Sequence, residues 1–142
     1  MSNNNLQPPA GFELFSFSGP FNQVLGDVYH KEINGQTACG FYVTSQQTNS
    51  LGICHGGALM TFADIALACA IASKMDKYAG LPTMNLNVDF LAAAEQGMWL
   101  QSSVDQLEMA YTSGFITASI KCDDQIILHA NGRYKIPKAA RG

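Results

Sequence analysis

Residues 55–73 read HGGALMTFADIALACAIAS, and this stretch decides the fold. Alanine, leucine and methionine favour helix, and the only polar side chains between Ala58 and Ala72 are those of Thr61 and Asp64. A helix that is apolar on every side is either buried in protein or embedded in a membrane. This stretch holds an acid and is too short to span a bilayer. The sequence therefore predicts a central helix wrapped by the rest of the chain.

Alternating apolar and polar residues predict strands on both sides of this helix. Before it, Asn34-Gly35 separates two apolar-rich runs, which is the strongest short-range signal for a β-hairpin. After it, four alternating runs with short links predict an antiparallel meander. The expected strands are 24–31, 37–44, 84–90, 99–107, 115–122 and 126–136, with a turn at Asp123-Asp124. We predict an α+β fold, a curved antiparallel sheet of about six strands around one long helix.

The length of 142 residues is that of one domain. Proline and glycine are frequent in residues 1–20, which we expect to form a tail or a short helix, with one helical turn around Phe12–Phe17. A single domain is expected over residues 21–138, followed by a tail over 139–142.

Charged residues make up 13% of the chain, about half of the roughly 25% that is typical of soluble domains. The net charge of −3 and the pI of about 5.4 argue against nucleic-acid binding, which needs a basic surface. A sheet edge left open in a single chain invites pairing with a second copy, and a buried contact surface would account for the missing charge. We expect a homo-oligomer, with neither nucleic acid nor membrane as a partner.

The four cysteines, Cys39, Cys54, Cys69 and Cys122, form no CxxC pair. Neither a zinc site nor a redox motif is therefore indicated. The first ten residues are polar and carry no signal-peptide pattern. We expect a cytoplasmic protein that needs neither a metal nor a redox cofactor.

Asp64 is the residue that most needs an explanation, because its helical neighbours are apolar or uncharged. A carboxylate in such surroundings is costly unless it is paired or hydrogen-bonded. One interpretation is a catalytic acid or base. The other is a structural acid that is bonded to the backbone or to a threonine hydroxyl.

The segment His55-Gly56-Gly57 is expected at the start of the helix. Helix N-termini present unpaired N–H groups, and glycines let a ligand approach the backbone closely. Such an end is suited to act as an oxyanion hole. The alternative is a flexible turn in which His55 caps the helix or packs in the core.

Together these residues resemble the signature of the hotdog-fold acyl-CoA thioesterases, a family with PaaI-type and THEM2-like members. The matching pattern is Asn49-x-x-Gly52-x-x-His55-Gly56-Gly57-(x6)-Asp64. The resemblance extends in motif to Phe90 and in strand order to residue 136. It implies a hotdog fold, in which a curved antiparallel sheet wraps one long helix.

The resemblance implies a role for each matching residue. Asp64 matches the acid that attacks the thioester carbonyl or activates water to attack it. Gly56 matches the glycine whose N–H polarises that carbonyl, and Gly57 stands beside it. In this reading a positioned base contributes about 10²–10⁴-fold and an oxyanion donor about 10²–10³-fold.

Three further positions carry implied roles. Asn49 matches a side chain that helps to hold the carbonyl or the water, and His55 matches the histidine of the glycine turn. Thr83 falls where related enzymes carry a serine or threonine that positions the water. In such enzymes two subunits share each site, so the resemblance implies a homodimer, often doubled into a tetramer.

The implied substrate is an aryl- or fatty-acyl-CoA, so coenzyme A is part of the substrate and not a cofactor. The acyl group is expected to contact Phe90, Leu91 or Met60. Arg133 and Lys135 are candidates for the phosphates of coenzyme A, although a solvated face accounts for such strand-end cations equally well.

Three alternatives stay open. One is a hotdog protein that binds acyl-CoA as a sensor or carrier without turnover, although such a protein has no need to bury Asp64. A second is hydration of an enoyl thioester with His55 as the base, although that reaction goes with a different spacing of acid and histidine. The third is a Cys54 thiol nucleophile, which adjacency to His55 does not by itself indicate.

Overall fold

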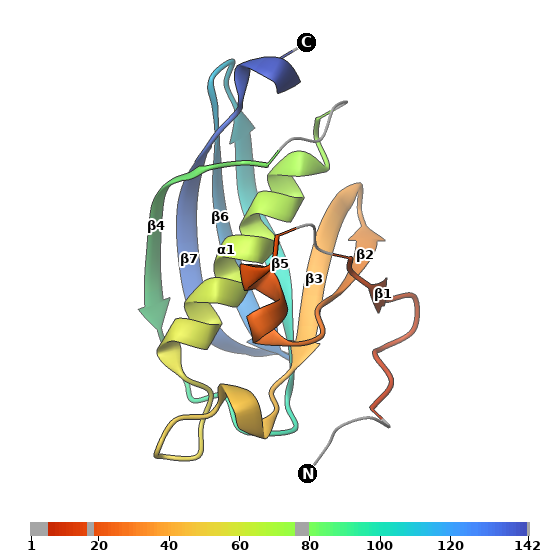
Figure 1. Ribbon diagram of the computed structural model, residues 1–142, viewed down its shortest axis with the longest axis vertical. Helices are drawn as coiled ribbons and strands as arrows, with labels where there is room; N and C mark the ends of the chain where they lie inside the picture. Colours follow the sequence, from red (N-terminus) through yellow and green to blue (C-terminus); the bar gives the residue numbers. More distant parts are fainter. Residues whose placement is uncertain (1–5, 17–18, 76–79, 142) are drawn as a thin grey trace.

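In the computed structural model, which describes residues 6–16, 19–75 and 80–141, a long helix lies against a curved sheet (Figure 1). The helix is α1 (Gly56–Ala72), and the sheet has seven strands in this described part of the chain. The strands are β1 (Glu13–Leu14), β2 (Tyr29–Ile33), β3 (Gln36–Tyr42), β4 (Thr83–Phe90), β5 (Trp99–Met109), β6 (Ser113–Cys122) and β7 (Gln125–Lys135). Three short 3₁₀ helices complete the fold: η1 (Phe21–Leu25), η2 (Ser45–Gln47) and η3 (Lys138–Ala140). The predicted architecture of one helix within a curved antiparallel sheet is confirmed.

The strand order is β1-β2-β3-β5-β6-β7-β4, and all neighbours are antiparallel. The predicted meander is right for β5, β6 and β7 but wrong for β4, which pairs with β7 at the far edge of the sheet. Residues 91–98 make this possible because they are longer than a hairpin loop and cross beneath the start of the helix. There the N–H of Cys54 donates to the carbonyl of Ala94 at 2.7 Å.

The β2–β3 hairpin forms where Asn34-Gly35 predicted it. Both residues have positive φ, 53° and 77°, as the tight hairpin turn requires. The strand before the turn begins at Tyr29 and not at residue 24 as expected. Residues 21–25 instead form η1, and Gly26, with φ of 98°, turns the chain out of it.

The N-terminal segment is not simply a tail or a helical turn. Glu13–Leu14 pairs with Tyr29 and His30 as β1, so the turn expected around residues 12–17 is wrong at these positions. Phe17 lies outside the described residues.

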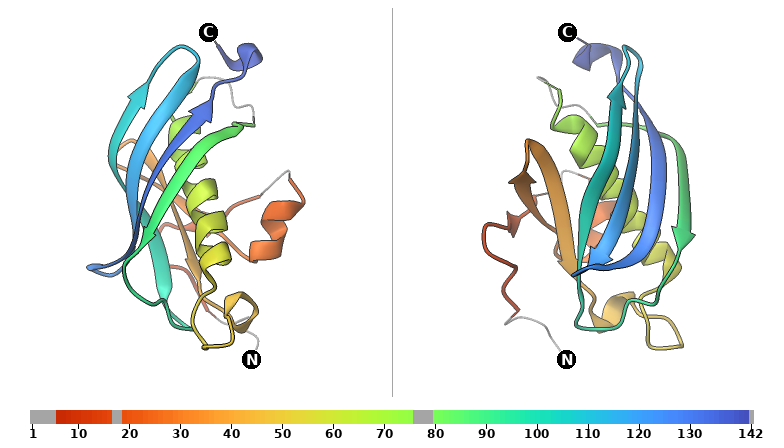
Figure 2. Two further views of the ribbon diagram at one scale, coloured as in Figure 1. Left: turned by 90° about the vertical axis from the view of Figure 1, so that its left-hand side faces the viewer. Right: turned by 180° about the vertical axis from the view of Figure 1, so that it is seen from behind.

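The core lies between the concave face of the sheet and one side of α1 (Figure 2). The rings of Phe62 from α1 and Phe41 from β3 pack with their centroids 4.5 Å apart, and both residues are fully buried. The opposite side of the helix is not wrapped by the sheet. A stripe of Gly57, Thr61 and Asp64 stays exposed or half-buried there, so the expectation of complete burial is wrong.

Two other features bear on the sequence predictions. In the part of the chain that the structure describes, no helix has the length and apolar character needed to cross a bilayer. All four cysteines are free, and Cys39, Cys54 and Cys69 are buried.

Candidate functional site

Asp64 lies half-buried on α1 and is held by two hydroxyl groups. The Oγ1 of Thr83, at the start of β4, donates to Oδ1 of Asp64 at 2.7 Å. The phenol of Tyr134 on β7 donates to the same oxygen at 2.9 Å and lies 3.2 Å from the main-chain carbonyl of Asp64. Three elements therefore fix one carboxylate oxygen.

The sheet register brings the two hydroxyls together, because Thr83 and Tyr134 are directly opposed on β4 and β7. Gly132 provides the space for the phenol ring. A Cβ at Gly132 would stand 2.8 Å from Cε2 of Tyr134 and 3.3 Å from Cδ2 of Leu67. The ring therefore occupies the volume that a side chain at position 132 would need.

Tyr134 is fully buried, and burial together with the Asp64 carboxylate raises the pKa of its phenol well above the usual value. A raised pKa keeps the phenol protonated at physiological pH, so it acts as a donor and not as a base. Among the described residues, no hydrogen bond engages Oδ2 of Asp64. This oxygen is left to accept a proton.

The start of α1 presents a different set of groups. His55 has extended backbone angles and caps the helix, because its Nδ1 accepts the N–H of Gly57 at 2.7 Å. The capping role that the sequence left open is therefore confirmed. Across the residues described, the N–H of Gly56 has no acceptor. A Cβ at Gly56 would lie 3.5 Å from Cζ of Phe90, so the Phe90 ring lies close to this residue.

Asn49 lies in the loop that leads into this helix. Its Oδ1 accepts the N–H groups of Leu51 at 2.9 Å and Ile53 at 3.4 Å, and its N–H donates to the carbonyl of Ile53 at 2.8 Å. The side-chain oxygen of Asn49 is thus used to build the loop. In the described chain its amide nitrogen has no recorded partner.

The two groups of residues do not meet within one chain. Gly56 and Asp64 are eight residues apart on one helix, a separation of about 12 Å along its axis at 1.5 Å per residue. A carbonyl within hydrogen-bond reach of one is therefore out of reach of the other. The structure joins Asp64 to Thr83 and joins His55 to Gly57, but it does not join these two sets.

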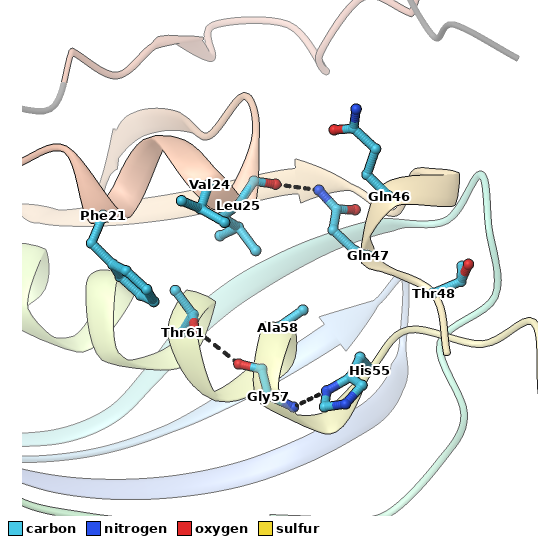
Figure 3. Close-up of a pocket in the computed structure, with 10 residues that line it drawn as sticks. All are labelled: Phe21, Val24, Leu25, Gln46, Gln47, Thr48, His55, Gly57, Ala58 and Thr61. Carbon is cyan, nitrogen blue, oxygen red and sulfur yellow. Dashed lines mark hydrogen bonds between the residues drawn. The ribbon is translucent and has the colours of Figure 1, made fainter. Parts of the chain in front are cut away.

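A pocket of about 260 Å³ lies beside the first turns of α1 (Figure 3). One wall is η1, with Phe21, Val24 and Leu25, and the other is the helix, with Ala58 and Thr61. Phe21 was not among the predicted site residues, and Val24 was expected in a strand. The signal was Pro20 directly before this apolar group, because proline suits the start of a helical turn.

The predicted substrate contacts lie outside this pocket. Phe90 and Leu91 are exposed at the end of β4, and Met60 is half-buried on α1. Arg133 and Lys135 flank the inward-facing Tyr134 on β7. Because side chains alternate along a strand, their exposed side chains lie on the sheet face opposite to the helix.

Tyr134 is the residue of the site that sequence reasoning missed. It falls in the inward-facing phase of the last strand, and a buried phenol needs a hydrogen-bond partner. That requirement was the available signal. Cys54 gains no support as a nucleophile, because burial raises the pKa of its thiol to about 11.

The sequence also matches a known family. The thioesterase superfamily matches residues 51–129, more than half of the chain. A Pseudomonas aeruginosa protein with a provisional esterase name is 25% identical over 130 residues, covering 91% of this chain and 97% of that protein.

Solved structures share the fold. The Escherichia coli PaaI protein from the phenylacetic acid degradation operon aligns with a TM-score of 0.71 and 22% identity, covering 84% of this chain and 86% of that one. Zebrafish thioesterase superfamily member 2 aligns with a TM-score of 0.71 and 25% identity, covering 84% and 89%. A hypothetical thioesterase protein from Streptococcus pneumoniae, solved with coenzyme A, aligns with a TM-score of 0.69 and 16% identity, covering 82% and 92%.

Proposed function

The chain belongs to the thioesterase superfamily, and we propose that it hydrolyses acyl-CoA thioesters to a free acid and coenzyme A. The observation that carries this proposal is the arrangement of Asp64, whose Oδ1 is held by two hydroxyls while Oδ2 is left unbonded within the described chain. Coenzyme A bound to the Streptococcus pneumoniae relative supports the class of substrate.

In the proposed reaction, Oδ2 of Asp64 removes a proton from a water molecule as that water attacks the thioester carbonyl carbon. The C–O bond forms, and the carbonyl π electrons move to oxygen. Collapse of the tetrahedral intermediate then breaks the C–S bond, and the departing thiolate takes up the proton that Asp64 removed from the water. Thr83 and Tyr134 keep the carboxylate oriented throughout, and a positioned base of this kind contributes about 10²–10⁴-fold.

The negative charge on the carbonyl oxygen needs a donor, and the N–H of Gly56 is the proposed one. The helix N-terminus adds a partial positive charge at that point. The N–H of Gly57 is occupied by His55, so Gly57 contributes through its lack of a side chain. The amide nitrogen of Asn49 is proposed as a second donor to the carbonyl oxygen or to the water.

The separation of about 12 Å along the helix between Gly56 and Asp64 leads us to place each site between two copies of the chain. Asp64 of one copy then faces the Gly56 of the other. The free edge of β4 supports this assembly, because Met84 and Phe90 on it are 51% and 50% exposed. We propose a homodimer, with a dimer of dimers as its doubled form.

Other assignments follow from the same proposal. Phe90, whose ring lies close to Gly56, is proposed to contact the substrate together with Leu91 and Met60. Arg133 and Lys135 lie on the other sheet face, and a coenzyme A phosphate reaches them only around a sheet edge. The reaction uses this chain and water, with no metal or redox group, and the free cysteines suit the reducing cytoplasm.

The test is release of free thiol from a panel of aryl- and fatty-acyl-CoAs. Wild type is compared with Asp64→Ala and with Asp124→Ala, in which an exposed acid of the β6–β7 turn is removed as a control. We expect turnover that falls at least 100-fold in Asp64→Ala only, the lower end of the general-base effect. Tight binding without turnover, or water addition to a crotonyl thioester, would replace hydrolysis as the function.

A further inference from the structure

The pocket beside η1 has an apolar wall that is largely exposed among the residues that the structure describes. Phe21 and Val24 are 67% and 73% exposed, and Figure 3 shows the Phe21 ring directed towards Thr61 on the facing helix. Large apolar side chains left exposed around a hollow indicate a site for an apolar ligand. The polar side chains that line the pocket are those of Gln46, Gln47, Thr48 and His55, together with Thr61 on the facing helix.

Gln47 fixes this wall relative to the start of the helix. Its side-chain nitrogen donates to the carbonyl of Leu25 at the end of η1, and its main-chain carbonyl accepts the N–H of His55 at 2.7 Å. Its side-chain oxygen also accepts the N–H of Thr44 at 2.7 Å, and the residue is 6% exposed. Gln47 therefore links the apolar wall, through its side chain, to the segment directly before Gly56, through its main chain.

The position of the pocket selects its occupant. The lining residues His55 and Gly57 flank Gly56 in the chain, so the pocket lies at the same end of the helix as the proposed oxyanion donor. The pantetheine arm is polar and elongated, whereas this wall is apolar. The acyl group is the part of the substrate that matches.

The volume limits the size of that group. A cavity of about 150 Å³ is enough to take up benzene, and this pocket has about 260 Å³. One aromatic ring with a short linker, or an alkyl chain of similar bulk, fits this space. A long fatty chain has to extend past Phe21 into solvent.

From these observations we infer that η1 and the first turns of α1 form the acyl pocket, and that Phe21 and Val24 set its preference for compact apolar acyl groups. This inference rests on the proposed thioesterase function and deepens it. Phe90 and Met60 do not line this pocket, so they remain available to contact the rest of the substrate.

The experiment compares kcat/KM for phenylacetyl-CoA with kcat/KM for acetyl-CoA. Val24→Trp fills the pocket, so the ratio between the two substrates is expected to fall at least tenfold. Leu14→Trp is the matched control, because Leu14 is 59% exposed on β1 outside the pocket, and it is expected to keep the wild-type ratio. Val24→Ala, which is free of any difficulty in placing a tryptophan, is expected to move the preference towards bulkier acyl groups.

Two results would overturn the inference. One is a wild-type ratio in both Val24 variants. The other is dissociation of the oligomer in Val24→Trp with an unchanged ratio, which would make the wall a contact between subunits. If wild type releases thiol from no member of the aryl- and fatty-acyl-CoA panel, the proposed function fails, and the pocket is then judged by calorimetry from the ratio of Kd values for phenylacetyl-CoA and acetyl-CoA.

Discussion

Helix α1 carries two groups of candidate site residues, one around Asp64 and one around Gly56, and the two groups are held in place in different ways. At Asp64 on α1, the hydroxyls of Thr83 on β4 and Tyr134 on β7 both donate to one carboxylate oxygen, and Tyr134 is fully buried. At Gly56, the arrangement is local, because His55 caps the helix from two residues away and the useful donor is a main-chain N–H.

In the proposed reaction, this difference divides the demands of hydrolysis between the two groups on one helix. A base needs a fixed orientation, which the packed sheet provides through long-range contacts. An oxyanion donor needs an accessible N–H, which the helix terminus provides without a side chain. Because the two groups lie about 12 Å apart along the helix, each group is one half of the site, a half-site, in the proposed dimer.

Of the changes that probe this contrast beyond Asp64→Ala, the largest effect is expected from removing the Gly56 donor. Gly56 is the first helical residue, where proline is well tolerated, and the ψ of 136° at His55 suits a residue that precedes proline. Gly56→Pro is expected to lower kcat by about 10²–10³-fold. Gly56→Ala keeps the N–H, and its Cβ would make ordinary contact with Phe90, so its loss should be much smaller. Equal rates for the two variants would remove the N–H from the mechanism.

Mixing two inactive variants tests whether the half-sites combine across subunits. In a heterodimer of Asp64→Ala and Gly56→Pro, one site carries both defects and the other carries neither. Random exchange of subunits is expected to restore about a quarter of the wild-type rate, because half of the dimers are mixed and each has one intact site of two. Co-refolded mixtures are assayed for thiol release against each parent alone. No recovery in verified heterodimers would place the whole site in one chain.

A smaller effect is expected at the Asp64 end from Tyr134→Phe, which keeps the ring and removes the hydroxyl. A hydrogen bond to a charged group is worth about 1.5–3 kcal/mol, so we expect kcat to fall about 10- to 150-fold with KM unchanged. Tyr111→Phe, at a tyrosine that is 72% exposed, is the control. A rise in KM with kcat unchanged would instead assign Tyr134 to substrate binding.

The smallest effect concerns stability in alkali. Burial raises the pKa of Cys54 from 9.0 to about 11, so the folded state holds this proton more tightly than the unfolded state. The associated stability is complete below pH 9 and is lost as the pH rises through about 11. We expect the free energy of unfolding to fall by roughly 2 kcal/mol over this range. Urea unfolding in reductant at stepped pH should show a shallower fall for Cys54→Ala, and parallel curves would contradict the assignment.

The contrast between local and long-range contacts also explains which features could be predicted from the sequence. The Asn34-Gly35 hairpin and the His55 cap are encoded by residues a few positions apart, so motif and turn chemistry were sufficient to find them. Asp64 stood out because an acid on an apolar helix is rare. The family resemblance then supplied the expected role of Thr83.

What the sequence did not reveal depends on long-range register. Tyr134 lies 70 positions from Asp64, and only the pairing of β4 with β7 directs its hydroxyl to the carboxylate. The predicted meander placed β4 beside β5, which would have separated Thr83 from Tyr134. Likewise, Val24 and Leu25 of η1 were expected in a strand, because apolar residues alone do not distinguish a short strand from a helical turn.

Gly132 has a consequence for how related sequences diverge. The Tyr134 ring fills the space in which a side chain at position 132 would lie, so the two positions should covary. A relative that acquires a larger residue at the position of Gly132 has to give up the inward-facing aromatic ring, and Asp64 then needs another hydrogen-bond donor. Alignments sorted by these two positions would therefore separate subgroups that orient the same carboxylate by different means.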